Sequence, residues 1–118
     1  MKPITVVLVC ALAASCGLGY EVTPLIAAAR EGDAQRILEL VKSGADVNER
    51  GGVNNWTPLM HAVHTNQPVA VKALIEAGAD VNATAGARGH DTALRLAELQ
   101  NHPNIAQFLR EHGAKPSQ

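Results

Sequence analysis

Apolar residues recur at the spacing of an α-helix in three segments of the chain that lie 34 residues apart. Within each segment one apolar residue follows another after three or four positions or stands next to it, which places them on one face of a helix. These residues are Ile37, Leu40 and Val41, then Val71, Leu74 and Ile75, then Ile105, Phe108 and Leu109. The pattern predicts three equivalent helices. We expect them to end at Gly44, Gly78 and Gly113, because glycine accepts the backbone of a C-terminal cap.

A shorter helix is predicted before each of these three. Thr-Pro-Leu occurs at residues 23–25 and 57–59, and Thr-Ala-Leu occurs at residues 92–94. Thr is a good N-terminal cap and Pro is tolerated at the first helical position, so each tripeptide is expected to open a helix. Pro68 and Pro103 then stand where two of the longer helices begin. The residues expected to end the shorter helices in a left-handed turn are Gly32, Asn66 and Asn101.

The connections between helix pairs also repeat. The pentapeptide GADVN fills residues 44–48 and again 78–82, and its first two letters return at residues 113–114. In the two complete copies, Asp46 and Asp80 are expected to brace the turn that follows a helix. The stretches rich in Gly, Asn and Ala, which we interpret as extended fingers between helix pairs, are residues 46–56 and 80–91.

The tripeptides, the glycines that end helices and the GADVN segments together strongly resemble the ankyrin repeat, in three copies over about residues 21–115. The resemblance implies an all-α fold: an ankyrin-repeat solenoid of three helix-turn-helix repeats joined by β-hairpin-like fingers, in which each repeat buries its apolar face against a neighbour. The family usually has His after each tripeptide, but this chain has Ile26, Met60 and Arg95. The expected boundaries are a short tether at 16–22, repeat 1 at 23–56, repeat 2 at 57–91, and repeat 3 with a C-terminal cap at 92–118.

Composition and charge narrow the possible functions. The 118 residues have room for one domain, and 47% hydrophobic with 18% charged residues is typical of a globular protein. The formal net charge is -1, so no basic stripe is available to neutralise phosphates, and specific nucleic-acid binding is not expected. The resemblance implies no cofactor, and we expect a monomer.

The first residues resemble a bacterial export signal. Met1 and Lys2 precede an almost unbroken apolar run at residues 4–14, which is too short to span a bilayer as a helix. The stretch before Cys16 is similar to a lipoprotein signal, which predicts removal of residues 1–15 and lipidation of Cys16. Ordinary cleavage nearby and an uncleaved anchor are the alternatives. We therefore expect the protein in the periplasm or cell envelope, held at the outer membrane if Cys16 is lipidated.

A catalytic site and a metal site are the two kinds of reactive site that the sequence could contain. The chain has no G-x-S-x-G, no H-E-x-x-H and no phosphate-cradling glycine loop, so an enzyme is not expected. A weak metal site is an alternative, because His61 and His64 are three positions apart on a predicted helix and His90, in the next finger, can approach them. In the other interpretation His61 is partly packed and His64 lies on the surface.

Protein binding is the remaining function, through the concave surface that ankyrin repeats build from finger tips and first helices. An exposed Trp56 among polar residues would be a strong anchor for a partner; in the alternative it packs over its own finger. We expect an exported, non-catalytic interaction module with an unidentified protein partner, such as an immunity protein for a toxin or an accessory protein of a periplasmic enzyme. The variable positions of the family fall on Val53, Asn54, Trp56, Arg88 and Asp91 in the fingers and on Arg30, Glu31, His64, Thr65 and Gln100 in the first helices.

Overall fold

The computed structural model describes residues 22–52 and 54–116, and in these ranges the chain forms six helices and no strand. The prediction of an all-α fold is therefore confirmed. None of these helices is long and apolar enough to cross a membrane. The predicted signal peptide at 1–15, Cys16 and Val53 lie outside the described residues. The helices are α2 (Pro24–Glu31), α3 (Ala34–Lys42), α4 (Pro58–His64), α5 (Pro68–Glu76), α6 (Ala93–Leu99) and α7 (Pro103–Glu111).

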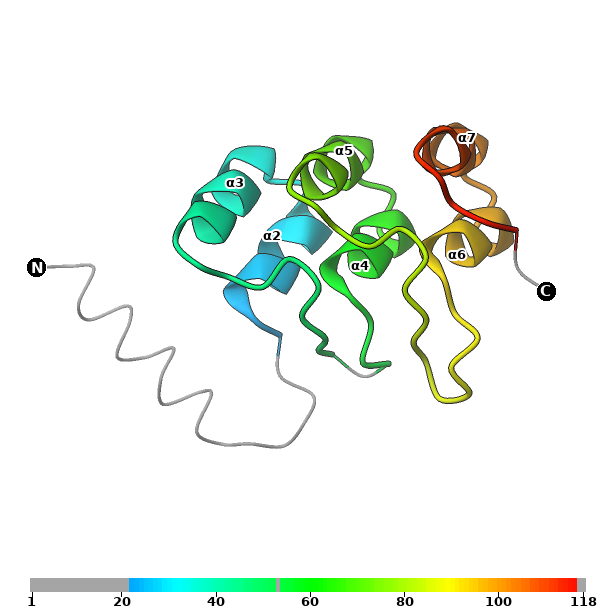
Figure 1. The fold of residues 1–118 in the computed structure, drawn as a ribbon, viewed down its shortest axis with the longest axis horizontal. Coiled ribbons are helices and arrows are strands. Elements are labelled where there is room, and N and C mark those ends of the chain that lie inside the picture. Colours follow the sequence, from blue (N-terminus) through cyan, green and yellow to red (C-terminus); the bar gives the residue numbers. More distant parts are fainter. Residues whose placement is uncertain (1–21, 53, 117–118) are drawn as a thin grey trace, which may run out of the picture.

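The helices stack as three pairs in two layers (Figure 1). The first helices of the pairs, α2, α4 and α6, lie side by side in one layer, and the second helices, α3, α5 and α7, lie in the other. The connections between pairs extend as fingers from the side of the first helices that faces away from the second layer. One side of each first helix is thus covered by its partner, and the fingers border the other side.

Each first helix begins at the predicted threonine. The side-chain oxygen of that threonine accepts a hydrogen bond from the amide nitrogen three residues on, which satisfies one of the donors that a helix start leaves without an intrahelical partner. Prolines stand in the first turn of α2, α4, α5 and α7, where their missing N–H costs nothing. The oxygen-to-nitrogen distances are 3.1 Å at Thr23, 3.3 Å at Thr57 and 3.1 Å at Thr92.

The turn inside each pair has left-handed backbone at the predicted residue. The φ angle is 78° at Gly32, 57° at Asn66 and 60° at Asn101. A Cβ atom at Gly32 would also meet the end of the Gln67 side chain, which would have to move away. Gln67 comes from the next repeat, and its Nε2 donates to the carbonyl oxygen of Arg30 at 3.2 Å. Gly32 therefore permits a contact between repeats as well as a turn.

The core runs without interruption between the layers. The alanines that follow each threonine after five positions are buried in it, and their small side chains let the first helices approach closely. Burial of a leucine side chain contributes about 2 kcal/mol, so the tripeptides supply stability as well as helix starts. Their leucines, each 1% exposed, are Leu25, Leu59 and Leu94.

The GADVN segments connect successive repeats by hydrogen bonds. Oδ1 of Asp46 accepts from the amide of Asn48 at 2.9 Å, which confirms the predicted bracing of the turn, and Asp80 does the same with Asn82. The asparagines have a role that the sequence did not predict. Oδ1 of Asn48 accepts from the amide of Asp80 at 2.8 Å, and Oδ1 of Asn82 accepts from the amide of Lys115 at 2.8 Å. Each asparagine therefore fixes the spacing to the repeat that follows.

Candidate protein-binding surface

Both fingers are closed by isolated β-bridges. In the first finger the amide of Gly51 donates to the carbonyl oxygen of Trp56 at 3.1 Å. In the second finger Ala85 and Asp91 exchange two such bonds, at 2.9 and 3.0 Å. These bridges agree with the predicted hairpin-like form of the fingers, and they position the residue before each tripeptide, Trp56 or Asp91, at the entrance to a first helix.

Trp56 is buried, with 7% of its surface exposed, so the expectation of an exposed tryptophan is wrong. Its ring meets the His61 ring edge-on, with centroids 5.6 Å apart, and lies 5.1 Å from the His64 ring. Both histidines belong to α4, the helix that follows the first finger. The alternative, in which Trp56 packs over its own finger, is right that the ring is buried, but the rings that it contacts belong to this helix and not to the finger.

Trp56 also connects the two fingers. Its Nε1–H donates to Oδ2 of Asp91 at 2.9 Å. The Asp91 carboxylate lies over Gly86, where an added Cβ would come within 2.3 Å of Oδ2. A hydrogen bond to a carboxylate is stronger than one between neutral groups, so this contact holds the second finger against the first.

His61 is buried beneath the first finger. Its Nε2 lies 2.9 Å from the carbonyl oxygen of Gly51, and because a carbonyl only accepts, Nε2 carries the proton. Burial lowers the pKa of His61 below its ordinary value, the charges of Arg30 and His64 lower the pKa further, and the hydrogen bond to Gly51 opposes them. The neutral ring is therefore a structural support of the finger.

Within residues 22–52 and 54–116 the metal alternative gains no third ligand. Nε2 of His61 is already bonded to Gly51. In the part of the chain that the structure describes, no three His, Cys, Asp or Glu side chains come together as a metal site requires. His61 and His64 instead flank the Trp56 ring, as the packed and surface histidines of the other interpretation.

The remaining predicted site residues divide by exposure. Thr65 is half-buried, and its hydroxyl donates to the carbonyl oxygen of His61 at 2.8 Å, so it completes the end of α4. Asp91 is half-buried and bonded to Trp56. The predicted residues that are exposed are Arg30, Glu31, Asn54, His64, Arg88 and Gln100.

Comparison with known proteins identifies the repeat. The chain matches the family model of ankyrin repeats in three copies, over residues 6–85 and 25–118. The chain belongs to the ankyrin-repeat family. Among solved structures it is similar to the human ASB11 ankyrin repeat domain, with 30% sequence identity and a TM-score of 0.69, over 79% of this chain and 41% of that one. It therefore spans less than half of that chain. No curated protein matches.

The ankyrin repeats bring three exposed side chains into one row. The residues seven positions after the capping threonines are Arg30, His64 and Leu99, at the ends of α2, α4 and α6. α4 packs between α2 and α6, so equal positions in the three repeats are neighbours. Leu99 is 64% exposed, but it is not among the residues predicted from the sequence. It directly precedes Gln100, and it has the same position in its repeat as His64. We call seven exposed residues at the ends of first helices and at finger tips the front surface: Arg30, Glu31, Asn54, His64, Arg88, Leu99 and Gln100.

Proposed function

We propose that this ankyrin-repeat protein is a non-catalytic binding module that recognises one partner protein through its front surface. The observation that carries the proposal is the row formed by Arg30, His64 and Leu99. Ankyrin repeats are interaction modules in general, and this row offers a cationic, an aromatic and an apolar contact on three adjacent helices. An exposed leucine beside polar neighbours has more to gain from a partner than from water.

The packing beneath the row supports a binding role. His64 is exposed, but its ring rests on Trp56, which is held in place by Asp91. The side chain therefore loses less conformational freedom on binding than an unsupported histidine would, and pre-organised contacts bind more tightly for the same buried area. Trp56 contributes to the surface from below rather than by direct contact.

The test compares two double variants in co-purification from the cell of origin. His64→Ala/Leu99→Ala removes two members of the row, and we expect the partner to be lost while the protein stays folded. Leu38→Ala/Lys72→Ala removes two exposed side chains from the second helices α3 and α5, and the partner should be retained. Equal loss in both variants, or retention in both, would show that the partner binds elsewhere.

We also propose that the protein is exported across a bacterial membrane and anchored by lipid at Cys16. The apolar run at residues 4–14 and the small residues before Cys16 support this proposal. Cys16→Ser is expected to release the protein from the membrane fraction. Persistent membrane association of the variant, with a processed N-terminus, would contradict the lipid anchor.

A further inference from the structure

Most of the arginines lie on a different side of the solenoid from the described lysines. Of the described lysines, Lys42 and Lys72 belong to the second helices and Lys115 follows α7. Arginine has a planar guanidinium that pairs with carboxylates through two parallel hydrogen bonds, whereas lysine is a point charge. The four arginines on first helices or fingers, out of six in the chain, are Arg30, Arg50, Arg88 and Arg95.

Three carboxylates of the fingers and first helices are engaged by other groups. Glu49 accepts a hydrogen bond from the hydroxyl of Thr23, and Asp91 accepts one from Trp56. Glu98 pairs with Arg110 of α7 at 2.6 Å, the one ion pair within residues 22–52 and 54–116. Glu31 is the single exposed acid of the front surface. The front surface together with Arg95 therefore carries three arginines and one acid, although the whole chain has a net charge of -1.

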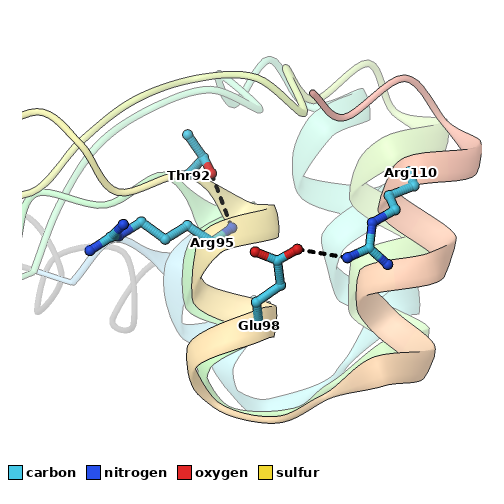
Figure 2. Close-up of polar contacts among 4 residues, drawn as sticks. All are labelled: Thr92, Arg95, Glu98 and Arg110. Carbon is cyan, nitrogen blue, oxygen red and sulfur yellow. Dashed lines mark hydrogen bonds and ion pairs between the residues drawn. The ribbon is translucent and has the colours of Figure 1, made fainter. Parts of the chain in front are cut away.

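Arg95 is the most informative of the four. Figure 2 shows its side chain extending away from α7, whereas the Glu98 carboxylate turns toward Arg110. Nε of Arg95 is buried and has no hydrogen-bond partner in the described part of the chain. Burying a charged donor without a partner is costly.

The fold does not require an arginine at this position. The equivalent residues of the other two repeats are Ile26 and Met60, and both are buried apolar side chains. An apolar residue would avoid the cost of the buried Nε–H. An external carboxylate that meets the partly exposed guanidinium would offset that cost.

We propose that the front surface receives an acidic segment of the partner protein, with one of its carboxylates on Arg95 and others on Arg30 and Arg88. This inference rests on the proposed binding function and specifies its partner. Arg30, Arg88 and Arg95 offer charge partners to such a segment, and Leu99 gives it an apolar contact at the same end of the solenoid as Arg95.

The experiment uses fluorescein-labelled decaglutamate as the probe and measures fluorescence anisotropy at low salt. We expect Arg95→Gln and Arg30→Gln each to weaken binding by about tenfold, the loss of a charge-assisted pair. Arg36→Gln is the matched control, since Arg36 is exposed on the second helix α3 and the substitution removes the same charge. It should change the affinity by less than about twofold. Decalysine should not bind.

The outcomes distinguish a failure of the acidic specificity from a failure of the proposed binding function, on which this inference rests. If Arg36→Gln weakens decaglutamate binding as much as Arg95→Gln, or if decaglutamate does not bind, the acidic specificity is overturned. The binding function still stands in that case if His64→Ala/Leu99→Ala abolishes co-purification of the partner. If that double variant retains the partner, the front-surface function is itself wrong. Thermal melts of each arginine variant distinguish lost binding from lost folding, and Arg95→Lys, which keeps the charge without the planar fork, should restore only part of the affinity.

Discussion

The indole Nε1–H of Trp56 and the carboxylate Oδ2 of Asp91 lie 2.9 Å apart and join the fingers of two successive repeats. Both residues stand directly before the threonine that caps a first helix, so the same position of repeats 1 and 2 supplies the donor and the acceptor. The bond places the tryptophan under the front surface and the carboxylate beside it. The conformation of each finger therefore depends on its neighbour.

A double-mutant cycle measures this contact. Trp56→Phe removes the donor, Asp91→Ala removes the acceptor, and the two effects on the free energy of unfolding should deviate from additivity by about 1–2 kcal/mol. The measurement is urea unfolding of both single variants and the double variant. Asp91→Ala combined with Gln107→Ala, on the exposed face of α7, is the control and should be additive within about 0.5 kcal/mol. Additivity in the Trp56 cycle as well would mean that the bond contributes nothing to stability.

Two leucines of α6 should separate stability from binding. Leu94 is 1% exposed, so Leu94→Ala is expected to lower the free energy of unfolding by about 3 kcal/mol. Leu99 is 64% exposed, and Leu99→Ala should change that free energy by less than about 0.5 kcal/mol while weakening the partner complex. Calorimetric melting and co-purification of the two variants provide the comparison. A Leu99→Ala variant as unstable as Leu94→Ala would place Leu99 in the core.

Gly32 is under a conformational and a steric constraint, and Gly44 shares only the first. Both have positive φ, 78° and 105°, so alanine at either position costs about 1 kcal/mol of backbone strain. At Gly32 the new Cβ also meets Gln67 at 2.2 Å, whereas nothing lies within 4 Å at Gly44. Gly32→Ala should therefore destabilise the protein more than Gly44→Ala in thermal unfolding. The variant Gly32→Ala/Gln67→Ala should recover part of the difference, and no recovery would contradict the steric account.

The lowered pKa of His61 predicts that the protein becomes less stable at mildly acidic pH. Burial lowers the pKa of His61 in the folded state, while the unfolded chain keeps a value of about 6.5. Below that pH the unfolded state binds more protons than the folded state, so the free energy of unfolding decreases as the pH falls toward the lowered pKa. Above about pH 7 the ring is neutral in both states and contributes no slope.

The variants for this pH dependence are His61→Leu and the control Gln107→Ala. Unfolding by urea between about pH 5 and 8 should show a shallower pH dependence for His61→Leu than for the unchanged protein. Gln107 is uncharged and exposed on α7, so Gln107→Ala should leave the slope as it is. An unchanged slope in His61→Leu would assign the effect to another group.

The helix starts, the left-handed turns and the repeat period could be predicted from the sequence because each depends on a few neighbouring residues. Thr57 caps α4 through an amide three positions away, and Asn66 adopts its conformation within one turn. The burial of Trp56 could not be predicted from its neighbours in the sequence. It depends on a carboxylate 35 positions later in the chain and on two rings of α4, so a polar sequence context around Trp56 was a poor guide to its exposure.

Part of the candidate site could be predicted from the sequence because it depends on the repeat period. The repeat register placed Arg30 and His64 correctly at the exposed ends of first helices. Leu99 is not among the residues predicted from the sequence, since an apolar residue on a helix usually packs in the core. The position of Leu99 relative to Thr92 matches that of His64 relative to Thr57, so the repeat register was enough to predict that Leu99 is exposed.

Site-specific photo-crosslinking tests most directly whether the partner binds the front surface. A photoreactive phenylalanine replaces His64 in one variant and Lys72, on the second helix α5, in another; both positions are exposed. The account predicts that irradiation of cells yields a covalent adduct of one defined mass from the His64 position and none from the Lys72 position. An adduct that forms only from the Lys72 position would place the partner on the opposite side of the solenoid and contradict the central claim.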